Sequence, residues 1–327
     1  NIELPGTAYF ELGRVQNVPG EADRLQTFVN EMLAQPAIAI DTETTGLVLW
    51  KDIPLYWSVA WPGKRATLHA NMLHYFQPLF QDRSKSWIMA NAKYDTHILA
   101  NVGINLAGNL VDTCVQHALL YEDKPHGLKF MAQHLHGWTY GDFQDQFGKI
   151  GAKQSAEQLI RRAEAENMNL LIEYAANDAW ATWTVYETLR KQLQDANTHS
   201  LYRTQAPYIE TLWDLFSKIE VPYTRVLWTM ERQGIKVNRA HLEASRPEAE
   251  TEIHQVEREI AKEVGFVLNP QSPKQLQDYF FNQRKHQPIK WSKGGKSGVR
   301  NPSCDSTFLE HIQYEDIVAK LVLRHRE

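Results

Sequence analysis

Two acidic residues lie one residue apart at the end of a short apolar run. Asp41 and Glu43 follow the segment 37–40, Ala-Ile-Ala-Ile, whose composition predicts a buried β-strand. Alternate side chains of a strand share a face, so both carboxylates should point to the same side of a sheet. Two neighbouring carboxylates repel each other unless a cation neutralises them, and Mg²⁺ prefers oxygen ligands. The pair therefore indicates a divalent-metal site, but a solvated strand end has the same pattern and the pair alone does not decide.

Two further motifs supply groups of the same kind. The motif Asn-Ala-Lys-Tyr-Asp at 91–95 follows a second apolar run, 86–90. Tyr174 and Asp178 lie in a helical pattern over 170–193, and a spacing of four places them on one helix face. A phenol and a carboxylate on one face can act on a common chemical centre. A buried tyrosine above an exposed aspartate has the same spacing, so this pair also needs the other motifs beside it.

The segments around these motifs predict a mixed α/β domain. Segments 55–61 and 65–69 have strand composition and are joined by the turn Pro-Gly-Lys at 62–64. From about 94 to 193 the apolar residues are mostly spaced as in helices. Three early strands, followed by a strand among helices, indicate a mixed sheet with flanking helices.

The second half of the chain is predicted to be helical. A long helical pattern runs over about 205–233, and Asn238 is placed to cap a helix that ends at Gly265. Ser272, followed by proline, is a second expected N-cap. The apolar periodicity is interrupted at 195–200, which predicts two domains, 1–197 and 198–327.

Composition narrows the class of protein. The 327 residues favour about two domains, and 35 basic against 39 acidic residues exclude a basic field over the whole protein. Two cysteines exclude a disulfide framework and a cysteine-rich zinc site. No apolar run approaches the ~18–20 residues that span a bilayer, and no signal peptide is visible. We therefore expect no membrane partner.

Four acids and a tyrosine, taken in chain order, resemble the DEDDy exonucleases, which are RNase H-like (DnaQ-like) enzymes that remove nucleotides from a 3′ end. Further stretches look like the proofreading domain of family A DNA polymerases, the DNA polymerase I type. These are Asp-Thr-Glu-Thr at 41–44, the motif at 91–95, Val-Asp-Thr-Cys at 111–114 and Tyr-Ala-Ala-Asn-Asp-Ala at 174–179. The resemblance covers nearly all of residues 30–193. It implies an RNase H-like mixed sheet with flanking helices.

The resemblance also implies a role for each acid in a two-metal mechanism with Mg²⁺ or Mn²⁺. Asp41, Glu43 and Asp178 match the residues that hold the first ion. Asp41 would bridge to the second ion, which Asp95 supports. Tyr174 and Glu43 match residues that orient the attacking water.

DNA-binding residues are expected in both halves. Leu47 and Asn91 fall where the family contacts the substrate strand. Segments 220–238 and 266–277 resemble the start of the polymerase domain, a mostly α-helical, thumb-like region. Between Phe281 and Ser303 there are six basic residues and no acid. In the family this part follows the minor groove of the primer–template duplex, although a solvated loop has the same composition. We expect phosphate contacts from Lys290, Lys293, Lys296 and Arg300.

These features predict the 3′–5′ proofreading exonuclease of a family A DNA polymerase in replication or repair. Its expected partners are the single-stranded 3′ end of DNA, the primer–template duplex, and a palm and fingers in a longer chain or a separate one. The expected location is the cytoplasm, or wherever the genome is replicated. Two alternatives remain: an RNase D-like or stand-alone DEDDy exonuclease, and a catalytically silent DNA-binding scaffold of a split polymerase. The polymerase-like segments argue against the first, and the intact acids against the second.

Overall fold

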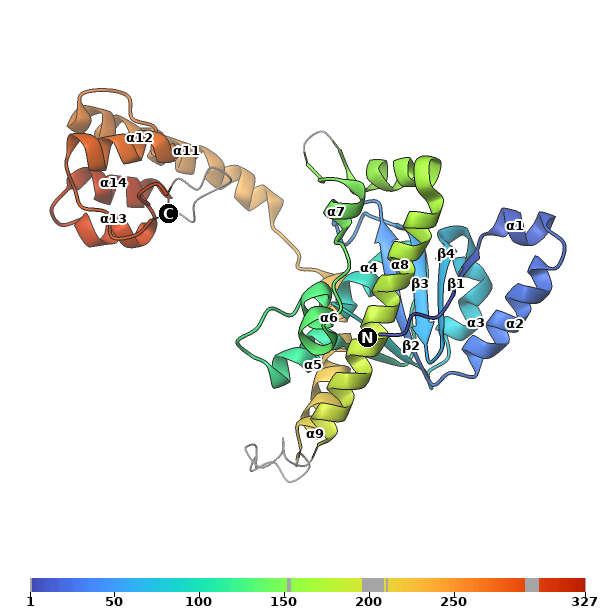
Figure 1. Cartoon of the computed structure of the whole chain (residues 1–327). Coiled ribbons are helices and arrows are strands. Elements are labelled where there is room, and N and C mark those ends of the chain that lie inside the picture. Colours follow the sequence, from blue (N-terminus) through green and yellow to red (C-terminus); the bar gives the residue numbers. More distant parts are fainter. Residues whose placement is uncertain (1, 152–153, 196–208, 210, 292–299, 327) are drawn as a thin grey trace. The chain divides into compact units, whose positions relative to one another are not determined.

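The computed structural model describes residues 2–151, 154–195, 209, 211–291 and 300–326. They form two compact units, Asn1–Gly234 and Ile235–Glu327, which are described separately below (Figure 1). The predicted domain boundary at 197/198 lies outside the described residues and stays a prediction. By packing, the helical segment at 212–233, which we expected in the second domain, belongs to the first unit, since α10 (Val221–Gln233) contacts strand β6 (Asn109–Asp112).

The first unit is built on one six-stranded mixed sheet, whose strands lie in the order β1 (Thr7–Phe10), β4 (Lys64–His69), β3 (Pro54–Trp61), β2 (Ala37–Thr44), β5 (Ser86–Met89) and β6. Strand β2 pairs antiparallel with β3 and parallel with β5, so it lies inside the sheet. The expected strands and the mixed sheet are confirmed, whereas β1 and β6 were not predicted, because neither contains four consecutive apolar residues or a polar–apolar alternation.

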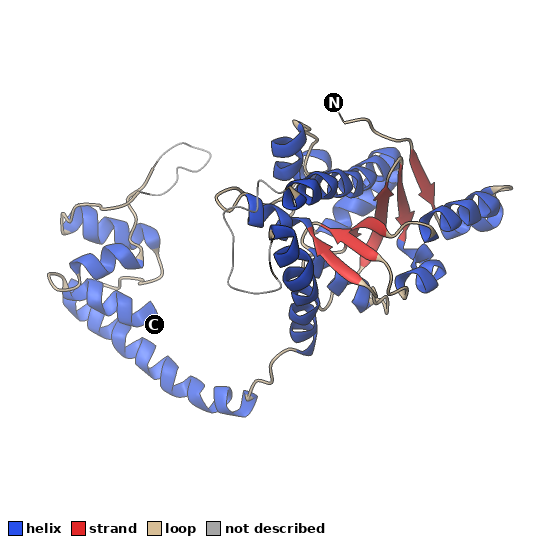
Figure 2. Ribbon diagram, turned by 90° about the horizontal axis from the view of Figure 1, so that it is seen from below, coloured by secondary structure: helices blue, strands red, loops and turns tan. Residues whose placement is uncertain are grey.

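Helices cover both faces of this sheet (Figure 2). Strand β3 is buried at every position, and its side chains alternate between the two faces. Trp57 and Val59 join one apolar core with Phe28 of α2, while Ala60 joins another with Trp180 of α8. Besides α10, the helical elements of this unit are α1 (Leu12–Asn17), α2 (Glu21–Leu33), η1 (Ala70–Phe76), α3 (Gln77–Phe80), α4 (Ala92–Asn101), α5 (Thr113–Leu120), α6 (Leu128–His136), α7 (Phe143–Phe147), α8 (Ala156–Gln194), α9 (Leu212–Leu215) and η3 (Phe216–Glu220).

Helix α8 is interrupted, and this interruption places its second part over the sheet. Asn167 has non-helical dihedral angles of φ −156° and ψ 70°. Its side-chain oxygen accepts a hydrogen bond from the N–H of Leu170 at 3.1 Å, as an N-cap does. Arg65 of β4, which is buried, then ties the restarted helix to the sheet through Glu173 and Asn177. The segment 168–194 is thereby fixed across β2 and β3.

The second unit is helical, as expected. Its helices are α11 (Arg239–Val264), α12 (Pro273–Gln277), η4 (Asp278–Gln283), α13 (Ser306–Ile312) and α14 (Ile317–Arg326). Asn238 and Ser272 accept N-cap hydrogen bonds and Gly265 ends α11 in the left-handed conformation, which confirms these three predictions. Phe280 and Phe308 are the largest fully buried side chains in its core. None of the helices in the described part of the chain combines the length and the apolar character needed to cross a membrane.

Gly108 provides a test of how β6 is placed. Gly103 and Gly108 both have φ near +80°, but a Cβ at Gly108 would lie 2.2 Å from the backbone oxygen of Lys85, while one at Gly103 meets nothing within 4 Å. Gly103→Ala should therefore lower the free energy of unfolding by about 1–2 kcal/mol, the cost of left-handed backbone. Gly108→Ala should lower it by about 1–3 kcal/mol more, because the turn before β6 must also move. Urea unfolding of both variants measures this, and equal losses would contradict the close approach.

Candidate active site

Strand β2 brings two of the predicted acids to one face. Asp41 lies opposite Ser58 and Glu43 opposite Tyr56 in the antiparallel pair with β3. Asp178 reaches the same place from α8, and one carboxylate oxygen from each of the three acids lies within 4.8 Å of the others. Glu43 and Asp178 are buried and Asp41 is partly exposed. The structure thus brings the two strand acids and the helix acid together.

Asp95 approaches the cluster from behind β2. It lies in the first turn of α4 and is 2% exposed, and its Oδ1 accepts a hydrogen bond of 2.7 Å from the Thr42 hydroxyl. It is not one of the three acids whose oxygens converge. Thr42 therefore connects Asp95 to the strand that carries Asp41 and Glu43, which is consistent with a supporting position.

Asp112 of β6 fixes the start of α4 and was not assigned a role from the sequence. Its carboxylate accepts hydrogen bonds from the backbone N–H groups of Asn91, Ala92 and Cys114 at 3.1, 2.9 and 2.9 Å. Asn91 is exposed and has a left-handed φ of 67°. One carboxylate thus caps two helices and holds the turn through which Asn91 is presented.

Tyr174 is held by aromatic contacts from α7. Its ring is edge-on to Phe147 and Phe143, with centroids 5.2 and 6.1 Å away. Burial, followed by the charges of Asp178 and Glu43, raises the pKa of Tyr174 far above its usual value. The phenol therefore keeps its proton and can donate a hydrogen bond beside the acids.

Burial and neighbouring charges also raise the pKa values of the acids. Burial, and then the charge of Asp178, raises the pKa of Glu43 to about 8. Burial raises the pKa of Asp95 to about 7, against the opposing hydrogen bonds from Thr42. The pKa of Asp41 is also raised, first by burial and then by the neighbouring carboxylates. Without a divalent cation the cluster thus tends to hold protons, and such a cation would replace them.

A lysine that the sequence reasoning missed lies among these groups. The Lys129 ammonium, near the start of α6, forms an ion pair with Oδ1 of Asp178. It also lies over the rings of Tyr140 and Tyr174, 3.6 and 4.6 Å from their centroids. Lys129 and Asp178 lie 49 positions apart, and no periodic pattern in the sequence links residues at that separation.

The acids open into a hollow of about 280 Å³. Leu47, 75% exposed, is at its edge, on a loop braced by hydrogen bonds from the Thr45 hydroxyl and the N–H of Val48 to Asp52. A cluster of three carboxylates fits a hard divalent cation such as Mg²⁺ or Mn²⁺, because all its donors are oxygens. The lining residues are Asp41, Thr42, Glu43, Thr44, Leu47, Tyr94, Phe143, Gln144, Ile150, Ala156, Ile160, Tyr174 and Asp178.

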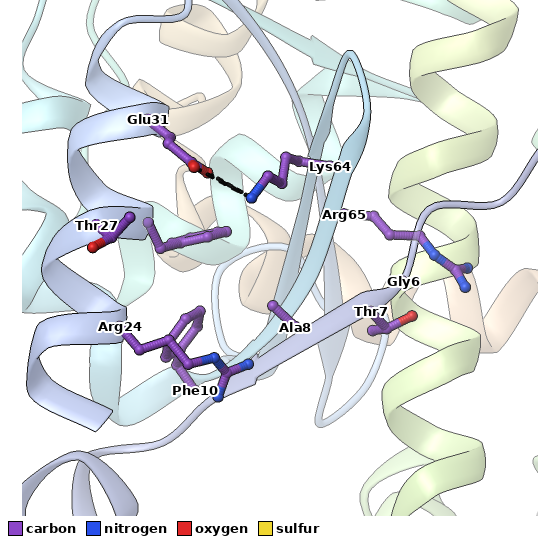
Figure 3. A pocket seen from close by; sticks show the side chains of 10 residues that line it. Gly6, Thr7, Ala8, Phe10, Arg24, Thr27, Glu31, Lys64 and Arg65 are labelled. Carbon is purple, nitrogen blue, oxygen red and sulfur yellow. Dashed lines mark hydrogen bonds and ion pairs between the residues drawn. The ribbon is translucent and has the colours of Figure 1, made fainter. Parts of the chain in front are cut away.

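A second hollow lies between β1 and α2 and differs in its chemistry (Figure 3). Its cationic side chains already have acidic partners: Lys64 pairs with Glu31, and Arg24 with Glu21. It therefore lacks the converging acids that mark the first hollow.

The predicted DNA-binding lysines lie in the second unit. Lys290 is exposed and forms an ion pair of 2.8 Å with Asp305, and Arg300 is exposed. Lys293 and Lys296 lie outside the described residues. Phosphate binding by this segment stays a prediction.

Comparison with known proteins gives a match to a family model and matches to several curated proteins. Residues 18–194 match the 3′-5′ exonuclease domain of the DNA polymerase A family. The chain is 27% identical to a DNA polymerase I of Chloroflexus aurantiacus over 94% of this chain and 32% of that protein. It is 25% identical to one of Synechocystis over 73% of this chain and 22% of that protein. The chain thus spans about a third or less of these relatives.

A solved structure shares the fold over nearly the whole chain. It is the POL domain of an M. smegmatis polymerase, in complex with DNA primer-template and dNTP. The likeness has a TM-score of 0.61 at 19% identity and covers 98% of this chain and 48% of the other.

The raised pKa values of the acids predict how stability depends on pH. Acids whose pKa is higher in the folded than in the unfolded protein bind more protons when folded, so the free energy of unfolding falls as pH rises. In EDTA, the Tm should therefore fall from pH 5 to pH 8, the range between an ordinary carboxyl pKa of about 4 and that of Glu43 at about 8. Mg²⁺ should raise the Tm strongly at pH 8 and weakly at pH 5. Glu43→Gln should flatten the decline, and a wild-type Tm in EDTA that is the same across this range would contradict the electrostatics.

Proposed function

The chain belongs to the 3′-5′ exonuclease family of A-type DNA polymerases, and on that premise we propose that it removes 3′-terminal nucleotides from DNA to proofread replication or repair synthesis. The observation that carries the proposal is the convergence of Asp41, Glu43 and Asp178 within 4.8 Å, beside a protonated tyrosine. These groups lie inside the segment that matches the family.

We assign each residue a part in hydrolysis. Asp41, Glu43 and Asp178 would hold a first divalent ion, most simply Mg²⁺, and Asp41, with the support of Asp95 through Thr42, would help to hold a second. Such ions would supply an activated water and charge stabilisation for the leaving 3′ oxygen. Tyr174 keeps its proton and, with Glu43, orients the attacking water by hydrogen bonding.

The substrate we propose is an unpaired 3′ end. The hollow of about 280 Å³ is at the small end of ligand pockets, which suits a terminal nucleotide rather than a duplex. We assign Leu47, at the edge of the hollow, to contact with the terminal bases, since base faces stack without sequence preference. We assign Asn91, exposed in the left-handed turn before α4, to the same strand.

The second unit would hold the duplex. We propose that Lys290, Lys293, Lys296 and Arg300 bind phosphates of the primer–template, as expected for a thumb-like domain. The M. smegmatis relative of this fold was solved with DNA primer-template, which supports the choice of ligand. Palm and fingers would come from the rest of a polymerase, in the same chain or another. Since the curated relatives are bacterial, we place the activity in the cytoplasm.

The two alternatives have weaker support. An RNase D-like or stand-alone exonuclease would not explain why polymerase relatives align over 94% of the chain, well beyond the exonuclease match. A silent scaffold would not require three converging acids, a supporting fourth and a tyrosine to be kept at one site.

A nuclease assay tests the function directly. With Mg²⁺, the chain should release nucleoside monophosphates from the 3′ end of DNA, about tenfold faster from a mismatched than a matched primer, since fraying a pair costs roughly 1.4 kcal/mol. Asp41→Ala should slow cleavage by at least on the order of 10³-fold, because it removes a ligand of both ions. Asp23→Ala, which removes an exposed carboxylate of α2, serves as the control. Equal rates on both primers would leave an exonuclease without a proofreading preference, and near-normal activity of Asp41→Ala would refute the site.

Tyr174→Phe separates water orientation from metal binding. The variant keeps the ring between Phe143 and Phe147 and loses only the hydroxyl, so Mn²⁺ affinity should change little. Cleavage should slow by roughly 10–10³-fold, the range for one positioned hydrogen-bonding group. Mn²⁺ titration beside single-turnover cleavage measures both, and a collapse of Mn²⁺ affinity would contradict the role given to Tyr174.

A further inference from the structure

The site contains a cation of its own. The Lys129 ammonium forms an ion pair with Asp178, one of the three converging acids. Among the ion pairs in the described part of the chain, it is the one that joins a cation to Asp41, Glu43, Asp95 or Asp178. Lys129 thus supplies one positive charge to the cluster of carboxylates. Balancing the negative charge of the cluster takes at least one further cation.

Two aromatic rings fix the place of this ammonium. It lies 3.6 Å from the ring centroid of Tyr140 and 4.6 Å from that of Tyr174, both within the range of cation–π attraction. The ring of Tyr174 is held edge-on by Phe143 and Phe147, so the lysine approaches a ring whose orientation is already constrained. One ammonium therefore contacts both the acid and the tyrosine of α8.

We propose that Lys129 is a positioning residue that acts as a built-in counter-cation: it holds Asp178 and Tyr174 in place and competes with the divalent ion for the Asp178 carboxylate. The inference rests on the proposed function, since it concerns the ions of that site. Its physical basis is that one carboxylate is attracted by both cations while the two cations repel each other. Metal affinity is thereby lowered in exchange for an ordered acid cluster.

This proposal predicts an unusual pair of effects. Removing the charge should strengthen metal binding, because the competitor is gone. It should also slow cleavage at saturating metal, because Tyr174 and Asp178 lose a shared contact. A lysine with a purely structural role would leave metal affinity unchanged or weaken it, and one that bound only substrate phosphate would raise KM without affecting metal binding.

The test compares Lys129→Met with the wild type. Mn²⁺ binding is measured without DNA by the loss of the free-ion EPR signal, and cleavage of a single-stranded oligonucleotide is measured at saturating Mn²⁺. Lys129→Met should bind Mn²⁺ about tenfold more tightly, from removal of one nearby charge, and cleave at least about tenfold more slowly, as for loss of a ligand-orienting partner. Lys124→Met, in the loop before α6, removes a lysine paired only with the exposed Asp123 and should change neither value.

The outcomes distinguish a failure of the role proposed for Lys129 from a failure of the proposed function. If the wild type neither binds Mn²⁺ nor cleaves DNA, the proposed function fails. If the wild type does both and Lys129→Met shows unchanged or weaker Mn²⁺ binding, or an unchanged rate, only the role of Lys129 is overturned.

A second measurement needs no variant and applies even if Lys129→Met does not fold. Acetylation of wild-type lysines, followed by mass spectrometry, reports how freely each amine reacts. Mn²⁺ should increase the reactivity of Lys129, because the ion displaces it from Asp178, while Lys124 stays unchanged. Equal or lower reactivity of Lys129 with Mn²⁺ would overturn the competition.

Discussion

Electrostatic repulsion among buried carboxylates is the constraint on which the first unit depends. Asp41, Glu43 and Asp178 converge within 4.8 Å, and Asp95 adds a fourth acid from behind the strand. Burial and the neighbouring charges raise the pKa values of Asp41 and Glu43, so the arrangement persists only with protons or cations present. The acids can be placed in this way only by an interior strand and two helices with defined starting points. The remaining elements of the first unit hold that strand and those helices in position.

Each support fixes an element that carries an acid. Asp112 caps the turn that starts α4, Asn167 restarts α8, and Arg65 ties that restarted helix to the sheet. The unit also extends past the family match at 194, because Arg225 of α10 donates hydrogen bonds to the backbone oxygens of Leu106 and Gly108 in the turn before β6. Helices expected in a thumb-like domain thus brace the sheet of the exonuclease.

The residues that carry the chemistry could be predicted from the sequence better than the contacts that hold those residues in place. Period-two and period-four spacing placed Asp41 with Glu43 and Tyr174 with Asp178, because local geometry decides which side chains share a face. Strand β1 and the ion pair of Lys129 with Asp178 were missed, since a four-residue strand is defined by its partner and the pair joins residues 49 positions apart. The cap by Asp112 depends likewise on how β6 meets α4, which no local pattern encodes.

The central claim is that these acids hold divalent ions. Anomalous diffraction from crystals soaked in Mn²⁺ tests it most directly, because it locates the ion without relying on activity. The account predicts an anomalous peak about 2.0–2.3 Å from oxygens of Asp41, Glu43 and Asp178, with a second peak beside Asp41 when a DNA 3′ end is bound. Mn²⁺ bound elsewhere in the crystal, with no peak among these three carboxylates, would contradict it.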